Sequence, residues 1–201
     1  MRPDAHRPLV RVLLECAVRG LADQGVAWSS QHIGNLLWAL ATLQERPPAA
    51  LAKAVATRMD FAEEHFKPQE VANALWGWAS LGLSGASLAV IRWTQHALRL
   101  ASSFKPQDIA NVLWALGQLQ HYPGRELLEA LCERIVSQAD HFNAQDVANS
   151  LSSFGCLEVT PRPAALVSLC EAACRLAKKM STQHLATSLW TLATLGASPS
   201  S

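Results

Sequence analysis

Polar side chains follow one face of a predicted helix near the middle of the chain, where the segment 86–101 carries Arg92, Gln95, His96 and Arg99. Their spacing of i, i+3, i+4 and i+7 places all four on one side of a helix. Guanidinium and imidazolium groups pair with phosphates, and amide and guanidinium groups hydrogen-bond to base edges. This face is therefore suited to binding a nucleic acid.

The same face recurs in neighbouring segments with different residues. Arg58, His96 and Arg134 share one position in three consecutive segments and predict a basic row for phosphates. The positions beside that row vary, as expected of an array that reads one nucleotide per unit. The alternative is an ordinary solvated helix face. The predicted RNA-binding residues are Arg58, Arg92, Gln95, His96, Arg99, Arg134 and Arg175.

Amide and indole side chains recur in a second predicted helix of each unit. Gln107 and Asn111 are four residues apart among apolar residues, so they need hydrogen-bond partners. We interpret them as part of a structural ladder that links adjacent units, with base recognition as the alternative. Trp114 and its equivalents can stack on bases, but their helical spacing beside leucines favours a place in the core.

Residue types that could support catalysis or metal binding occur without the necessary spacing. The five cysteines form no C-x-x-C pair, and no cysteine or histidine pair completes a tetrahedral site. The seven histidines do not pair with an obvious nucleophile, and no phosphate-loop, HExxH, GxSxG or kinase motif occurs. The sequence predicts no enzymatic activity, no cofactor and no metal.

The composition predicts a well-packed protein, since half of the residues are hydrophobic and 16% are charged. The formal net charge is +1, so any basic surface is local. No apolar run approaches the roughly 18 residues that span a bilayer, and we expect no membrane partner. The first residues, with Asp4 among them, resemble neither a signal-peptide core nor a good transit peptide.

The elements that position these side chains repeat every 38 residues. The second helix of each unit reads SSQHIGNLLWALATL at 29–43, KPQEVANALWGWASL at 67–81, KPQDIANVLWALGQL at 105–119, NAQDVANSLSSFGCL at 143–157 and STQHLATSLWTLATL at 181–195. The 143–157 copy is the weakest, with Ser152 and Ser153 at the Trp-Ala positions. The step contains no insertion, which is typical of a repeat array.

Helix boundaries are marked in the sequence of each unit. Ser29, Asn143 and Ser181 are suitable N-caps of the second helices, and Gly82 and Gly196 are suitable stops. Acids that can close a capping box occupy the third helical position at Glu70, Asp108 and Asp146, and prolines occupy the first at Pro68 and Pro106. The first helix of each unit begins near proline or glycine and carries most of the lysines and arginines.

Two helices in each 38-residue unit predict an all-α fold, an α-solenoid of five helical hairpins that we expect to form a right-handed superhelix. The predicted units span about 7–45, 46–83, 84–121, 122–159 and 160–197 of a single array. We also expect the second helices to be the buried layer and the first helices to line the concave face. Five units give a small footprint, so we expect the chain to be a fragment of a longer protein.

The segment Phe104–Leu116, with the pattern Phe-x-Pro-Gln-x-x-Ala-Asn-x-Leu-Trp-Ala-Leu at a 38-residue step, resembles the octotricopeptide repeat family. The likeness covers residues 10–196. The fourth unit departs from the pattern at Ser152 and Ser153, and the fifth has Thr187 in place of Asn. The family is related to proteins with FAST-kinase leucine-rich regions, which often end in a RAP domain.

The resemblance implies an organellar RNA-binding protein that acts in RNA processing, mRNA stability or translation. Its implied partners are single-stranded RNA from organellar transcripts and other ribonucleoprotein components. Its implied location is the mitochondrial matrix or the chloroplast stroma. The alternative is a protein-interaction scaffold, since helical solenoids offer concave surfaces to peptides as readily as to RNA.

Overall fold

The computed structural model describes residues 7–23, 26–58 and 66–196, and within these ranges it is helical, with no strand. The first helices of successive pairs are α1 (Arg7–Ala22), α3 (Ala49–Arg58), α5 (Leu88–Leu100), α7 (Arg125–Gln138) and α9 (Pro163–Leu176). The second helices are α2 (Ser30–Leu43), α4 (Pro68–Ser80), α6 (Pro106–Gln118), α8 (Ala144–Cys156) and α10 (Thr182–Thr194). Short 3-10 turns at Ala101–Ser103, Ala139–His141 and Ala177–Lys179 follow α5, α7 and α9. The predicted α-solenoid is confirmed.

The predicted caps begin the second helices. The side chain of Ser29 accepts a hydrogen bond from the backbone N–H of His32, and Ser181 accepts one from His184 in the same way. The predicted acids close the caps in the middle units, where the backbone N–H groups of Lys67, Lys105 and Asn143 donate to Glu70, Asp108 and Asp146 at 3.0, 3.0 and 3.1 Å. Local chemistry therefore sets where these helices start.

A left-handed residue follows each second helix at the same position of the repeat. The two predicted stops, Gly82 and Gly196, have φ values of 63° and 66°. The other three units place Gln44, Gln120 and Glu158 there, with φ values of 56°, 50° and 55°. Glycine adopts this region without steric penalty, whereas a side chain carries a cost. The turn geometry is thus a property of the 38-residue unit and not of the glycines alone.

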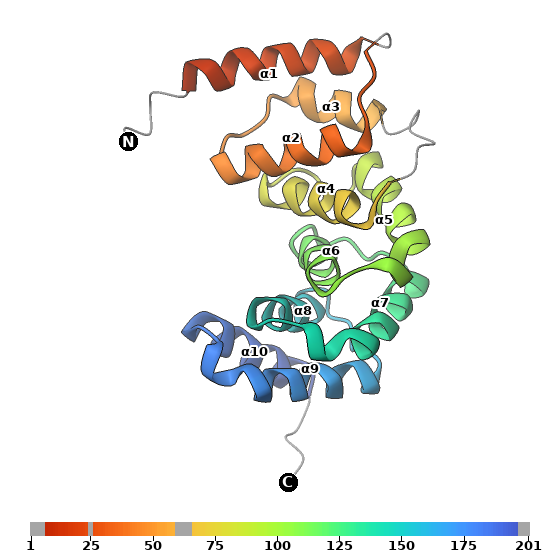
Figure 1. Cartoon of the computed structure of the whole chain (residues 1–201), viewed down its shortest axis with the longest axis vertical. Helices are drawn as coiled ribbons and strands as arrows, with labels where there is room; N and C mark the ends of the chain where they lie inside the picture. The colour runs from red at the N-terminus through yellow and green to blue at the C-terminus, as the bar shows by residue number, and fades with distance from the viewer. Residues whose placement is uncertain (1–6, 24–25, 59–65, 197–201) are drawn as a thin grey trace.

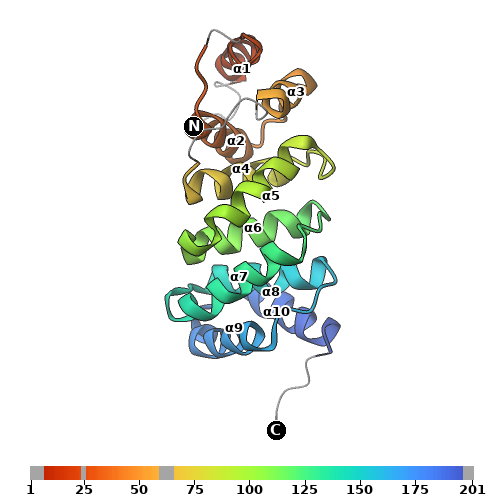
Figure 2. The same cartoon turned by 90° about the vertical axis from the view of Figure 1, so that its right-hand side faces the viewer.

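The helices form two layers that run the length of a curved array (Figure 1). The outer layer consists of the first helices, and α5 and α7 lie on its convex side. The inner layer consists of the second helices and lines the concave side. Figure 2 shows the outer layer from the front, with α5, α7 and α9 stacked over the inner helices. The expectation that the first helices line the concave face is wrong.

The direction of curvature follows from small residues in the inner layer. A Cβ atom added at Gly77 of α4 would lie 2.7 Å from the backbone carbon of Leu37 in α2. One added at Gly117 of α6 would lie 3.3 Å from the Cα atom of Ser153 in α8. Inner helices therefore approach one another very closely, and an array bends toward the layer in which neighbours are closer.

Candidate nucleic-acid interface

A row of amides and indoles follows the inner layer along the concave side. Each unit contributes three positions spaced i, i+4 and i+7, which helix geometry places on one face. We call these positions the concave row. It consists of Gln31, Asn35 and Trp38; Gln69, Asn73 and Trp76; Gln107, Asn111 and Trp114; Gln145, Asn149 and Ser152; and Gln183, Thr187 and Trp190.

The glutamine side chains of the concave row are exposed in all five units. The asparagines behind them are half-buried, apart from Asn35, which is exposed. None of these amides has a hydrogen-bond partner among the described residues, so the predicted ladder between units is wrong. Helix-to-helix links in the inner layer come from other groups. The hydroxyl of Ser30 donates to Glu70 at 2.7 Å, and Gln120 Nε2 donates to the carbonyl of Cys156 at 3.2 Å.

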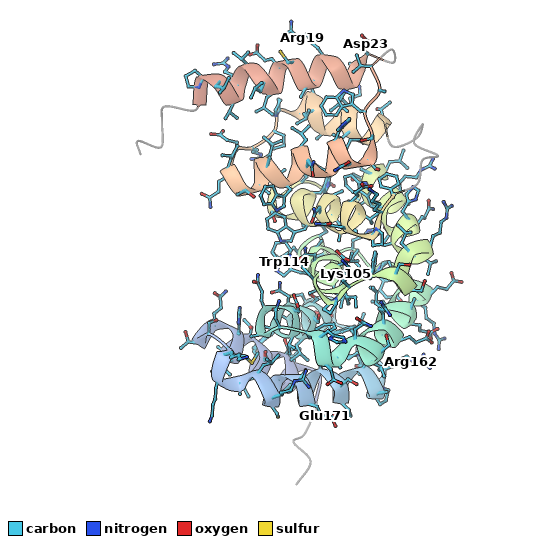
Figure 3. The ribbon with its side chains drawn as sticks, in the orientation of Figure 1. Arg19, Asp23, Lys105, Trp114, Arg162 and Glu171 are labelled. Carbon is cyan, nitrogen blue, oxygen red and sulfur yellow. The ribbon has the colours of Figure 1, made fainter. Side chains whose placement is uncertain are left out.

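The indoles of the concave row are more accessible than a core position allows. Trp38 is 49% exposed and Trp190 is 55% exposed. Trp76 and Trp114 are half-buried, with ring centroids 6.2 Å apart and ring planes inclined by 34°. Figure 3 shows Trp114 on the concave side. The prediction that these indoles belong to the core is wrong for Trp38 and Trp190, whereas Trp114 packs at the edge of the core. The accessible parts of these rings can stack on flat ligands.

The buried tryptophans lie between the layers. Trp93 of α5 is fully buried and meets Trp78 of α4 edge-on at 5.4 Å between ring centroids. The indole N–H of Trp78 donates to the carbonyl of Ser84 at 3.0 Å. Aromatic packing therefore joins the two layers at these positions, while the indoles of the concave row stay available.

Two residues of the predicted basic row on the outer layer, His96 and Arg134, contact the preceding unit. His96 lies against Phe66, with ring centroids 4.4 Å apart. Arg134, one repeat later, donates from Nε to the carbonyl oxygen of Phe104 at 2.8 Å. Phe66 and Phe104 are themselves 38 residues apart, so His96 and Arg134 fill the same structural place. The helical part of α3 includes Arg58, but its side chain lies outside the described residues.

The remaining predicted residues are scattered over the outer layer. Arg175 donates to the carboxylate of Asp140 at 3.1 Å and to the carbonyl of Ala139 at 2.8 Å. Gln95 and Arg99 are exposed on α5, whereas Arg92 is half-buried. The structure therefore brings Arg92, Gln95, His96 and Arg99 together on α5, and it places Arg134 and Arg175 at separate contacts between units. RNA binding by all seven residues stays a prediction.

Burial shifts the pKa of a histidine and of two aspartates near these sites. Desolvation lowers the pKa of His96, and the nearby Arg99 and Arg92 lower it further. The imidazole is therefore a poor source of positive charge at neutral pH. In the inner layer, burial raises the pKa of Asp108 and that of Asp146, and the charge of Asp108 adds to the rise at Asp146.

Metal-binding clusters and membrane-spanning helices are both absent among the residues that the structure describes. No cluster of three or more His, Cys, Asp or Glu residues that could hold a metal ion occurs among residues 7–23, 26–58 and 66–196. Within the same ranges, no helix has both the length and the apolar character to cross a membrane.

The sequence indicated a binding role for the concave row only as the alternative, because exposure cannot be read from the repeat alone. One signal was present: glutamine occupies its position in all five units although neighbouring surface positions vary. A polar residue that is repeated without variation has either a fixed partner or a fixed ligand. The structure provides no partner within the described residues.

Comparison with protein families finds a match over nearly the whole chain. The family described as RNA-editing substrate-binding complex 6 protein matches residues 10–198. Within the described ranges, the match runs from the first turn of α1 through α10. No curated protein matches the sequence.

Proposed function

Because the chain belongs to the RNA-editing substrate-binding complex 6 protein family, we propose that it binds single-stranded RNA within an organellar RNA-processing complex. Its partners are then an RNA strand and other protein components of the complex. The family name refers to RNA editing, and this process favours a mitochondrial location over a chloroplast location. Further links to octotricopeptide, FAST-kinase and RAP proteins rest on the motif resemblance alone, which points to the same class of ligand. A role without catalysis is part of the proposal.

The observation that carries this proposal is the concave row. Exposed amides without partners supply donors and acceptors for base edges, and the half-exposed indoles supply stacking surfaces. Single-stranded RNA presents both base edges and base faces, whereas a duplex hides them. The row therefore suits unpaired bases better than paired ones.

The mechanism is steric and positional. Five units that each hold about one base would cover roughly five nucleotides. A strand held along the inner layer has its bases turned toward the protein, so it is shielded from nucleases and from pairing with other strands. Binding of this kind keeps a substrate strand in place while other components of a complex act on it.

The charge of the concave row predicts an unusual salt dependence. None of its fifteen positions is lysine or arginine, so few phosphate counterions are released when RNA binds. Affinity should therefore fall only shallowly with salt concentration. Stacking and hydrogen bonding, rather than phosphate neutralisation, supply most of the binding free energy.

A matched pair of substitutions tests which layer binds RNA. Gln107→Glu adds one negative charge to the concave row, and Gln95→Glu adds one to the outer layer, both at exposed positions and with little change of shape. We expect Gln107→Glu to weaken binding of a single-stranded oligonucleotide about fivefold, or ~1 kcal/mol. Gln95→Glu should change it little. Fluorescence anisotropy with single-stranded and duplex RNA measures both.

The opposite ranking of the two variants would move the interface to the outer layer and support the predicted basic face there. Equal binding of duplex and single strand would contradict recognition of unpaired bases. Thermal unfolding of both variants serves as the folding control, since exposed glutamines are expected to contribute little to stability.

The amides of the concave row favour a second candidate function, a scaffold for an extended peptide, because amides also hydrogen-bond to peptide backbone groups. Retention of RNA at low salt separates the two functions. A protein that retains no single-stranded RNA even at low salt is better described as a peptide-binding scaffold.

A further inference from the structure

The concave row is not uniform along its length. Between α4, α6 and the turn after α2 lies a groove of about 680 Å³, within the range of small-molecule sites. Trp76 and Trp114 lie side by side in its wall, and Gln44, Arg46, Ser80 and Gln118 form its polar part. Residues from three consecutive units therefore meet at one place.

The two indoles form one aromatic surface in the wall of the groove. Their ring centroids are 6.2 Å apart and their planes are inclined by 34°. Because the two rings adjoin and both are partly exposed, a flat base can stack on one of them or across both.

The polar part of the groove complements a nucleotide. Arg46 is exposed and alone is ionisable among the described residues that line the groove. The groove lining contains no carboxylate, whereas Glu15 and Glu45 share a neighbouring pocket with Arg46. On the groove side, a phosphate group is a suitable partner for the exposed guanidinium. The exposed amides of Gln44 and Gln118 can both donate and accept hydrogen bonds at base edges.

The row of indoles is interrupted beside this groove and resumes at Trp190 in the fifth unit. The next unit has Ser152 at the indole position, so stacking cannot continue from Trp114 into the fourth unit. A base held by Trp76 and Trp114 therefore has a fixed place in the array. It would define which nucleotide of a bound strand lies against which unit.

We propose that this groove is a subsite for one purine nucleotide of a single-stranded RNA, with the base stacked on the adjoining indoles and its phosphate on Arg46. The inference rests on the proposed RNA-binding function and specifies where recognition is strongest. A purine is favoured over a pyrimidine because its two fused rings match the area of an indole and give greater overlap.

The test uses a uridine oligonucleotide with one central adenosine, the same oligonucleotide with uridine throughout, and one with an abasic central position. We expect the wild-type protein to bind the adenosine form about tenfold more tightly than the abasic form. Trp114→Leu should abolish this difference, and Trp114→Phe, which keeps an aromatic face, should retain most of it. Trp190→Leu removes an indole of the same row outside the groove and should leave the difference intact.

The possible results distinguish failure of the proposed subsite from failure of the proposed function. If the wild-type protein binds none of the oligonucleotides, the proposed function fails. If it binds them but Trp114→Leu and Trp190→Leu behave alike, the function stands and the purine subsite is refuted. Arg46→Gln adds an independent measurement without altering the indoles, since it should reduce the salt slope of binding by about one phosphate contact. An unchanged slope would remove the phosphate part of the subsite.

Discussion

The inner and outer layers carry polar residues for different purposes. In the outer layer, charged side chains such as Arg134 and Arg175 bind backbone carbonyls and acids of the preceding unit. In the inner layer, the amides of the concave row bind nothing within the described residues, and the indoles beside them are partly open. Charged side chains therefore connect neighbouring units of this array, whereas neutral polar groups form the candidate binding surface.

The buried and the half-buried tryptophans are expected to show this difference most strongly, through their effects on stability. Trp93→Ala removes a fully buried indole between the layers, and we expect it to lower the free energy of unfolding by about 3–5 kcal/mol. Trp114→Ala removes a half-buried indole and should cost roughly half as much. Chemical denaturation measures both. Equal losses would mean that Trp114 is a core residue after all.

The arginines of the outer layer provide a test of intermediate size. Arg134→Ala removes a charge-assisted hydrogen bond to the carbonyl of Phe104. We expect a loss of about 1 kcal/mol in the free energy of unfolding because the site is half-buried. RNA affinity should be unchanged at every salt concentration. A loss of RNA affinity with unaltered stability would instead make Arg134 a phosphate ligand, as the sequence alone suggests.

The smallest expected effect concerns the carboxylates that cap the inner helices. Burial raises the pKa of Asp108 in the folded protein above its value in the unfolded chain. The folded state then binds the proton more tightly, so this group adds stability as the pH falls from neutral through the raised pKa. Asp108→Asn keeps an oxygen acceptor for the cap and cannot titrate.

The wild-type protein should therefore gain stability relative to Asp108→Asn between about pH 7 and pH 4, by less than ~1 kcal/mol. Urea denaturation at a series of pH values measures the difference. A difference that shrinks on acidification would show that the hydrogen bond from the backbone N–H of Lys105 outweighs burial.

The features that could be predicted from the sequence are those fixed by local chemistry. The 38-residue step, the capping boxes at Glu70, Asp108 and Asp146, and the stops at Gly82 and Gly196 depend on residues within one turn of each other. Periodicity and capping report such contacts directly. The helices and the solenoid class were accordingly predictable.

The side of the array that becomes concave depends on distances between units, which periodicity does not report. Gly77 opposite Leu37 and Gly117 opposite Ser153 let inner helices approach more closely than side chains of ordinary size allow. Small residues repeated on one helix of each pair were the available signal. Because the sequence does not reveal the curvature, it favoured links between units for the amides and a ligand-binding row for the arginines.

The fixed 38-residue step has a consequence for how such a protein can change over generations. One residue inserted into an inner helix turns everything after it by about 100°, which would carry later glutamines and indoles off the concave side. Loops tolerate length changes better, but the step contains no insertion in any of the five copies. Duplication or deletion of a whole unit preserves the alignment, and each such event would lengthen or shorten the bound strand by about one base. The length of strand that such an array covers can therefore change only in steps of one whole unit.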